Sequence, residues 1–203
     1  MSYTIGIIGS GHIGHGLATH LAKTTYPVLI TNSRGPASLA DLVASIGGSL
    51  TAADFNQTIA QSDVLFIAVP WAQIPDVARE VQKYSGKIIV DASNNIVSVS
   101  PFRLADTAGK PTGEYVAGLF PAQRVVKAFN TLPAATLAQP SPTSIGHSVI
   151  IMSGDDADAK KEIADITRAM GFEPIDIGTF RQGGPLQDIG GALSGIELIR
   201  VKR

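Results

Sequence analysis

The stretch IGIIGSGHIGHGLATHLA, residues 5–22, starts as an apolar strand, passes through three spaced glycines and continues as an amphipathic helix. Gly9, Gly11 and Gly14 match the pattern G-x-G-x-x-G, in the strand-to-helix setting that the pattern requires. Gly9 permits the tight turn, Gly11 leaves room for a pyrophosphate, and Gly14 lets the helix pack closely on the strand. The N–H groups at the helix start then face the phosphates. We therefore expect a dinucleotide site here; the alternative is a tight turn that binds no ligand.

The end of the next strand predicts which dinucleotide is bound. A site specific for NAD usually places an acidic residue about 20 residues beyond the glycines, where it bonds the ribose 2′-hydroxyl. This chain instead reads TNSRG at residues 31–35, with Asn32, Ser33 and Arg34 in that position. A guanidinium can hold a 2′-phosphate through paired hydrogen bonds, and the serine hydroxyl can donate to it as well. The sequence therefore favours NADP(H) over NAD(H); the alternative is that Arg34 is a solvated loop charge.

Outward from this unit, strand and helix patterns alternate along the chain. The expected strands are almost continuously apolar, which is typical of a parallel sheet covered on both faces. They cover residues 3–8, 27–31, 64–69, 87–91, 124–129, 148–152 and 173–177. The expected helices cover residues 12–23, 36–46, 71–84, 155–170 and 182–199. This alternation predicts an α/β fold: one Rossmann-type, doubly wound, mainly parallel sheet over residues 1–203, with 178–203 as a small C-terminal helical appendage.

The region between residues 92 and 122 is harder to assign, because it is rich in Ser, Thr, Pro and Gly. We expect SNNIVSVSP (93–101) to be a loop, and GEYVAGLFP (113–121) to be a short helix or a lid. In the appendage, five glycines within RQGGPLQDIGGALSG (181–195) weaken the prediction of a continuous helix. In helix 155–170, Asp155 and Asp156 are interpreted as charges at a helix start rather than as a catalytic carboxylate pair.

Ligands of doubly wound folds lie across the carboxyl ends of the strands, so the loops there are further candidates. Trp71, which begins a helix, either packs on a substrate or belongs to the core. The remaining candidate cofactor contacts occupy three such loops: Ala68, Val69 and Pro70 in the first, Asn94 in the second, and Asn130 and Thr131, near the nicotinamide carboxamide, in the third.

Composition excludes several other classes of function. The chain has 203 residues, 44% of them hydrophobic and 16% charged, with a formal net charge of −1 and no cysteine. These values are typical of a globular protein, and they offer no basic surface for nucleic acid or membrane and no thiol chemistry. No apolar run reaches the roughly 18 residues of a membrane span. We expect a soluble, cytoplasmic protein. The four histidines form no cluster with acids at metal-ligand spacing, so we predict no metal site and assign no catalytic residue.

Together these motifs resemble the NADPH-dependent deazaflavin (coenzyme F420) reductase family, and also the cytosolic oxidoreductase domain of six-transmembrane ferric reductases. The motifs are GIIGSGHIGHGLA, NSRG, VLFIAVPW, VVKAFNTLPA and SGDDADAKKEIADITRAMGFEPIDIG, and the resemblance extends from residue 3 to about residue 190. It implies an NADP(H)-binding Rossmann domain whose C-terminal part closes a pocket for a flavin-like acceptor. The corresponding positions are Ser10, Gly11, His12 and Ile13 at the pyrophosphate, Ser33 and Arg34 at the 2′-phosphate, Val69 and Pro70 under the ribose, and Asn94 and Ala134 beside the nicotinamide.

The leading hypothesis is hydride transfer between NADPH and a planar acceptor, a flavin or deazaflavin, with ferric iron as a downstream acceptor. Such a reaction needs mainly alignment and exclusion of water. The acceptor would lie between AVPW, FNTLPA and the C-terminal segment, in a homodimer whose second subunit completes the wall. Backbone would approach the acceptor ring closely at Gly183, Gly184, Gly190 and Gly191. The alternatives are a non-catalytic NADP(H)-sensing module and an imine or 2-hydroxy acid reductase.

Overall fold

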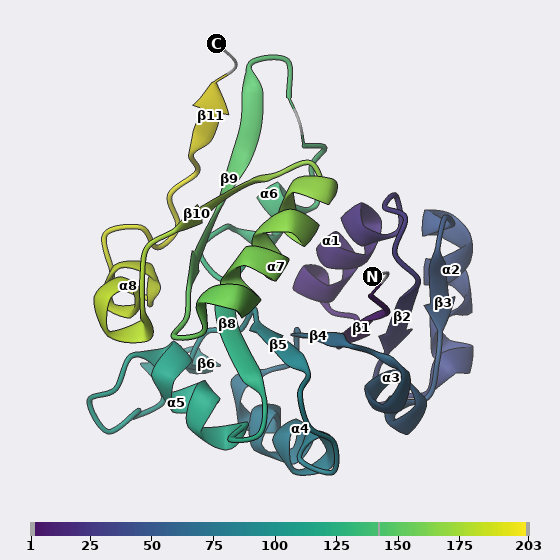
Figure 1. The fold of residues 1–203 in the computed structure, drawn as a ribbon, viewed down its shortest axis with the longest axis horizontal. Helices are drawn as coiled ribbons and strands as arrows, with labels where there is room; N and C mark the ends of the chain where they lie inside the picture. Colours follow the sequence, from purple (N-terminus) through teal and green to yellow (C-terminus); the bar gives the residue numbers. More distant parts are fainter. Residues whose placement is uncertain (1–2, 142, 202–203) are drawn as a thin grey trace.

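The computed structural model describes residues 3–141 and 143–201. Its strands are β1 (Ile5–Ile8), β2 (Val28–Thr31), β3 (Leu50–Ala52), β4 (Val64–Ile67), β5 (Ile88–Asp91), β6 (Ile96–Val99), β7 (Phe102–Leu104), β8 (Arg124–Ala128), β9 (Gly146–Ser153), β10 (Glu173–Asp176) and β11 (Ile199–Val201). The main sheet has the order β10-β9-β8-β5-β4-β1-β2-β3, and β11 pairs with β9 (Figure 1). The six neighbouring strands β8, β5, β4, β1, β2 and β3 run parallel to one another, while β9 is antiparallel to β8. The predicted doubly wound, mainly parallel sheet is confirmed.

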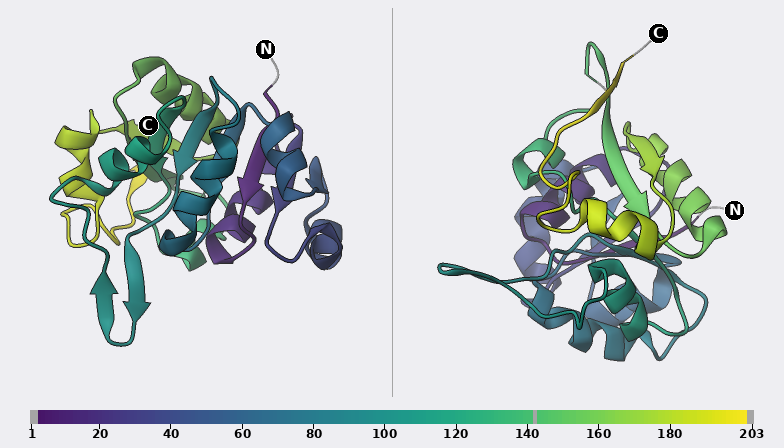
Figure 2. Two further views of the ribbon diagram at one scale, coloured as in Figure 1. Left: turned by 90° about the horizontal axis from the view of Figure 1, so that it is seen from below. Right: turned by 90° about the vertical axis from the view of Figure 1, so that its left-hand side faces the viewer.

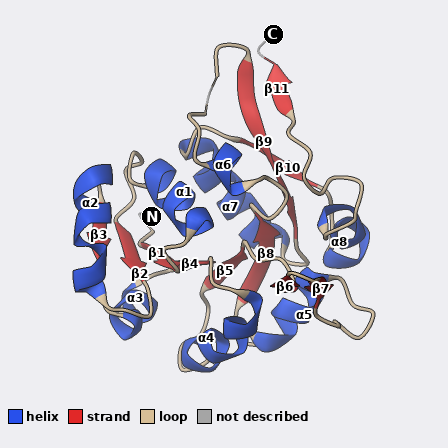
Figure 3. Ribbon diagram, turned by 180° about the vertical axis from the view of Figure 1, so that it is seen from behind, coloured by secondary structure: helices blue, strands red, loops and turns tan. Residues whose placement is uncertain are grey.

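Helices cover both faces of this sheet (Figure 3). They are α1 (His12–Leu21), α2 (Ala40–Ile46), α3 (Phe55–Gln61), α4 (Ile74–Val81), α5 (Thr112–Leu119), α6 (Ala134–Leu137), α7 (Ala157–Ala169) and α8 (Phe180–Gln187), with short 3₁₀ turns η1 (Pro36–Leu39) and η2 (Trp71–Gln73). Strand β4 shows how the two cores form. Val64 and Phe66 point into the core shared with α1 and α7, while Leu65 and Ile67 point into the core shared with α4 and α5. Because both faces are buried, the strands need apolar residues at every position.

The order of the strands places the glycine-rich loop at a topological switch point. Strands β1 and β4 are neighbours, yet the chain leaves β1 toward β2 on one side and leaves β4 toward β5 on the other. At such a point the loops at the carboxyl ends separate and leave a crevice. Strand β3 and helix α3 connect β2 to β4 and were not predicted, because three-residue and seven-residue elements give a weak periodic pattern.

Residues 92–122 contain more regular structure than predicted. The stretch 93–101 is not all loop, because Ile96–Val99 pairs with Phe102–Leu104 as an antiparallel hairpin. The mostly apolar stretch Ile-Val-Ser-Val is too short for a sequence pattern to distinguish a strand from a loop. The hairpin projects from the body of the protein beyond the carboxyl ends of the parallel strands (Figure 2). The stretch 113–121 forms helix α5, which is one of its two predicted alternatives.

The C-terminal segment contains a helix, but a shorter one than predicted. Helix α8 begins with a capping box between Thr179 and Gln182 and ends at Gln187, so the prediction of helix through residue 199 is wrong. Gly190 and Gly195 have positive φ angles of 87° and 74°, which interrupt the helix. The chain then returns to pair Ile199–Val201 with β9. Among the described residues, no helix has the length and apolarity needed to cross a membrane.

Candidate functional site

The three glycines of the first loop have the three different surroundings that the motif predicts. Gly9 has a φ of 110°, and a Cβ there would lie 2.3 Å from the Ala68 carbonyl oxygen. A Cβ at Gly14 would lie 2.0 Å from the Gly9 carbonyl oxygen, so the helix packs on the strand at backbone contact. A Cβ at Gly11 would meet no atom within 4 Å. Two glycines are thus required by the fold, whereas Gly11 borders open space at the start of α1.

The loop after β2 is joined to the glycine-rich loop through Asn32. The Asn32 side chain donates to the Ser10 hydroxyl at 3.0 Å, and its carbonyl oxygen accepts from the Arg34 backbone N–H at 2.9 Å. The second contact is an Asx turn, which fixes the direction of the following residues. Ser38 adds a hydroxyl hydrogen bond to the same Asn32 oxygen at 3.1 Å. The side chains of Ser33 and Arg34 are left exposed at the carboxyl end of β2.

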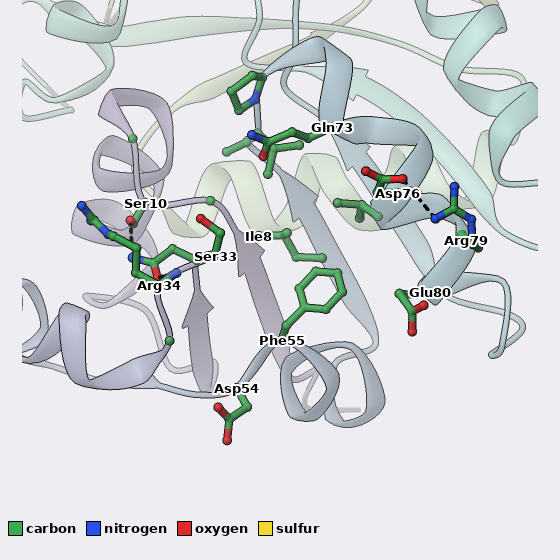
Figure 4. A pocket seen from close by; sticks show the side chains of 18 residues that line it. Ile8, Ser10, Ser33, Arg34, Asp54, Phe55, Gln73, Asp76, Arg79 and Glu80 are labelled. Carbon is green, nitrogen blue, oxygen red and sulfur yellow. Dashed lines mark hydrogen bonds and ion pairs between the residues drawn. The ribbon is translucent and has the colours of Figure 1, made fainter.

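A cavity of about 810 Å³ extends from these loops to helix α4. Figure 4 shows Ser10, Ser33 and Arg34 on one side of it, with Asp76, Arg79 and Glu80 on the opposite side. The cavity includes nine of the predicted contacts: Ser10, Gly9, Gly11, Asn32, Ser33, Arg34, Ala68, Val69 and Pro70. The sequence did not single out its other polar and apolar lining residues, which include Asp54, Phe55, Gln73, Asp76, Val77, Arg79 and Glu80. They lie on α3 and α4 or, for Asp54 and Gln73, directly before these helices, and the orientation of the helices toward the crevice has no local sequence signal.

A second group of predicted residues lies beyond this cavity, over the carboxyl ends of β5 and β8. The side chains of Asn94 and Asn130 are paired: Asn94 Nδ2 donates to the Asn130 backbone oxygen at 3.0 Å, and Asn130 Nδ2 donates to Asn94 Oδ1 at 3.2 Å. Asn130 also bonds Gln187 of α8, donating to its backbone oxygen at 2.9 Å and accepting from its Nε2 at 3.1 Å. Asn130 is 6% exposed, whereas Asn94 is half-buried. Asn94 therefore offers the more accessible amide.

Sequence reasoning missed a buried ion pair directly beneath this group. Lys127 Nζ lies 2.9 Å from Asp91 Oδ2 and 2.9 Å from the Ser93 backbone oxygen, and both charged side chains are 0% exposed. Asp91 Oδ1 in turn accepts from the Ser93 N–H at 3.0 Å and from its hydroxyl at 2.6 Å. A lysine inside the apolar strand RVVKA was the available signal, because a buried charge requires a partner.

The remaining predicted residues are distributed along the same edge of the sheet. His12 is exposed on the first turn of α1, and Ile13 packs partly against the core. Thr131 is buried and its backbone oxygen accepts from the Gly195 N–H, while Ala134 begins α6. Trp71 stacks on a tyrosine of α5 with ring centroids 5.5 Å apart, as a core residue does.

The predicted approach of backbone to a ligand ring at Gly183 and Gly184 is wrong. A Cβ at Gly183 would lie 2.7 Å from Ile177, and one at Gly184 would lie 2.5 Å from Pro111. The space at both glycines is filled by the chain itself, so they serve the packing of α8.

As predicted, Asp156 caps a helix: it accepts from the backbone N–H of Ala159 at the start of α7. Within residues 3–141 and 143–201, no group of three or more His, Asp or Glu side chains is arranged to hold a metal ion.

Comparison with known proteins gives a consistent picture. Residues 4–95 match the family model described as NADP oxidoreductase, coenzyme F420-dependent. Metalloreductase STEAP3 of Rattus norvegicus is 33% identical over 91% of this chain, which spans 36% of the length of that relative. A crystal structure of a hypothetical protein from Sinorhizobium meliloti is 40% identical, with a TM-score of 0.91 and coverage of 98% of this chain and 96% of that one. A candidate F420-dependent NADP reductase from Arthrobacter sp. FB24 has the same fold, with a TM-score of 0.75 at 23% identity, and covers 98% of this chain and 100% of its own.

Proposed function

We propose that this chain, whose residues 4–95 match the family of coenzyme F420-dependent NADP oxidoreductases, binds NADP(H) and transfers hydride between NADPH and a planar flavin or deazaflavin. The observation that carries the cofactor assignment is the open space at Gly11 beside the exposed Ser33 and Arg34. The open space at Gly11 lets a pyrophosphate reach the backbone N–H groups at the start of α1. The Arg34 side chain offers a guanidinium to a 2′-phosphate. No carboxylate follows β2 to repel that phosphate, since Asn32 occupies the position.

The direction of the bound dinucleotide follows from these two contacts. If the 2′-phosphate lies at the β2 loop and the pyrophosphate at the β1 loop, the nicotinamide half extends the opposite way, over β4, β5 and β8. The Asn94–Asn130 pair lies at the ends of β5 and β8. Ser10, Ser33 and Arg34 would then hold the adenosine half, and Asn94 would orient the nicotinamide half. The dinucleotide supplies the hydride, and the protein aligns the two rings and excludes water.

The choice of a flavin or deazaflavin as acceptor rests on the family and on the form of the site. The family description names coenzyme F420, and a relative is described as a metalloreductase, which suggests ferric iron as a downstream acceptor. Hydride transfer between two rings requires no general acid or base. This agrees with a nicotinamide-side group made of neutral amides, from Asn94, Asn130 and Gln187.

The test is to follow the loss of NADPH absorbance with purified protein and each of three acceptors: a flavin, a deazaflavin and a ferric chelate. We expect oxidation with a flavin or deazaflavin, and faster oxidation with NADPH than with NADH. An Arg34→Ala variant should lose the preference for NADPH. Tight NADP(H) binding without turnover on any of these acceptors would contradict the reductase assignment and favour the NADP(H)-sensing module instead.

The proposed enzyme is a homodimer, and the exposed face of the β6–β7 hairpin supports this. Val97, Val99, Phe102 and Leu104 are all exposed, with Val99 at 80% and Phe102 at 57%. Val99 pairs with Phe102, and the alternation along β7 puts Leu104 on the same face, opposite Ser98 and Arg103; the register shifts at Val97, between Ile96 and Ser98. An uncharged apolar face is complementary to a second copy of itself. Sedimentation should show that Phe102→Lys dissociates the dimer, whereas Ser98→Lys on the opposite face does not; a monomeric parent protein would exclude this arrangement.

A further inference from the structure

Five polar groups over the ends of β5 and β8 form one continuous hydrogen-bonded network. Its members come from three segments: Asp91 and Ser93 at the end of β5, Lys127 and Asn130 at the end of β8, and Gln187 at the end of α8. Gln187 Nε2 donates both to Asn130 Oδ1 at 3.1 Å and to the Lys127 backbone oxygen at 3.4 Å. The network is almost fully removed from water, because Asp91, Lys127 and Gln187 are 0% exposed and the other two are at most 6% exposed.

Both polar groups of the Ser93 backbone are held by charged side chains. Its N–H donates to Asp91 Oδ1 at 3.0 Å, and its carbonyl oxygen accepts from Lys127 Nζ at 2.9 Å. The peptide that follows leads directly into Asn94, so the position of the Asn94 backbone is set from beneath by the ion pair. Hydrogen bonds to ionised groups in a buried site are stronger and better fixed than neutral ones. A fold that needed only stability would gain as much from apolar residues at these two positions.

The loop after β8 is held by an independent constraint. Phe129 has a φ of 67°, in the left-handed region that a bulky residue seldom adopts. Its ring is buried against Phe66 and Phe172, which keeps the backbone in that conformation. The turn directs Asn130 toward Asn94 and Gln187, where its amide makes the three side-chain contacts described above. Such strained residues concentrate at functional sites.

We infer that the Asp91–Lys127 ion pair is a positioning device that fixes the Asn94 amide for the nicotinamide half of NADP(H). The inference rests on the proposed function, because it takes the nicotinamide to lie over β5 and β8. Asp91 and Lys127 act through Ser93, while Asn130 holds the Asn94 side chain from the other side and is itself held by Gln187. In this arrangement the fully buried Asp91, Lys127 and Gln187 do not touch the dinucleotide, and the half-buried Asn94 contacts it.

The test measures binding of the adenosine half and of the nicotinamide half of the dinucleotide separately. The double variant Asp91→Asn with Lys127→Met removes both charges together, because removing one alone would leave a buried charge without a partner. Calorimetry is run with NADP⁺ and with 2′,5′-ADP, which has the adenosine half and its 2′-phosphate but no nicotinamide. We expect unchanged affinity for 2′,5′-ADP, a loss of the extra affinity for NADP⁺, and a hydride-transfer rate lowered about tenfold to hundredfold.

Two further variants keep the result decisive. Lys160 and Asp176 form another 2.9 Å ion pair, between α7 and β10, and the variant Asp176→Asn with Lys160→Met should leave both affinities unchanged. Gln187→Met keeps the side-chain volume but removes the side-chain hydrogen bonds to Asn130 Oδ1 and to the Lys127 backbone oxygen, and it should lower the ratio of NADP⁺ affinity to 2′,5′-ADP affinity. If the double variant does not fold, the Gln187→Met variant alone tests whether the network positions Asn94. A parent-like affinity ratio and rate in the folded variants would overturn the inference, whereas failure of the parent protein to bind 2′,5′-ADP would overturn the proposed function.

Discussion

Replacing Gly11 by alanine is the sharpest test of the phosphate site, because the fold tolerates the change while a bound phosphate does not. Gly11 has a φ of −69°, which any L-residue adopts, and its Cβ would meet no atom within 4 Å. The stability cost is that of alanine at a helix start, below about 1 kcal/mol. The methyl group would occupy the space in which a pyrophosphate approaches the backbone. Losing one hydrogen bond to a charged phosphate costs about 1.5–3 kcal/mol, so affinity for NADP⁺ should fall about tenfold to hundredfold.

Two glycine variants serve as controls for this measurement. Gly118→Ala in α5 also adds a methyl group to open space; it should leave NADP⁺ affinity unchanged and should not lower the melting temperature, because alanine favours a helix more than glycine does. Gly14→Ala forces a Cβ to within 2.0 Å of the Gly9 oxygen and should lower the melting temperature sharply. Calorimetric titration with NADP⁺ and thermal unfolding measure the two effects separately. A Gly11→Ala protein that binds NADP⁺ as tightly as the parent would refute the assignment of this loop to the pyrophosphate.

Three further outcomes follow from individual side chains. Arg34→Ala should weaken NADP⁺ binding about tenfold to hundredfold and leave NAD⁺ binding unchanged in calorimetry, while Arg79→Ala across the cavity changes neither. Burial lowers the pKa of His20 below its ordinary value of 6.5, so the unfolded chain takes up a proton first and the free energy of unfolding falls as the pH drops below that value. His20→Gln should lose less stability than the parent between about pH 7.5 and about pH 5.5 in urea titrations; an equal loss would contradict this. Asp156→Ala removes the side-chain cap of α7 and should cost about 1 kcal/mol, measured the same way.

The loops that we propose for the adenosine half could be predicted from sequence because the determinants of their geometry are local. Gly9, Gly11 and Gly14 act within one strand–turn–helix unit, and Arg34 follows the very next strand. Each role depends on backbone conformation or charge within a few residues, which a pattern can report. The prediction of a long C-terminal helix was wrong because the structure of that segment depends on distant residues. Beyond the end of its helix at Gln187 the chain returns to pair with β9, and that pairing depends on residues about fifty positions away.

The buried network shows why the nicotinamide half could not be derived in the same way. Asn130 and Asn94 were predicted from the loops they occupy, but not their mutual pairing, which joins segments 36 residues apart. Gln187 is 57 residues from Asn130 and lies in a helix with no pattern that marks it. Lys127 and Asp91 are charged residues inside apolar strands, so the sequence predicts that each has a buried partner. The sequence does not identify that partner for either residue.

The two halves of the proposed site therefore differ in how many segments a single substitution affects. At the β2 loop, Ser33 and Arg34 are exposed, so we expect a substitution there to alter the proposed recognition of the 2′-phosphate and little else. Over β5 and β8, Asn94 is joined to a buried ion pair, a strained Phe129 and the end of α8, so a substitution there alters several segments together. The base of the β6–β7 hairpin begins at the next residue, where Asn95 Nδ2 donates to the Ala105 oxygen at 2.9 Å. Substitutions in that hairpin should therefore leave the residues that fix Asn94 undisturbed, because the network ends where the hairpin begins.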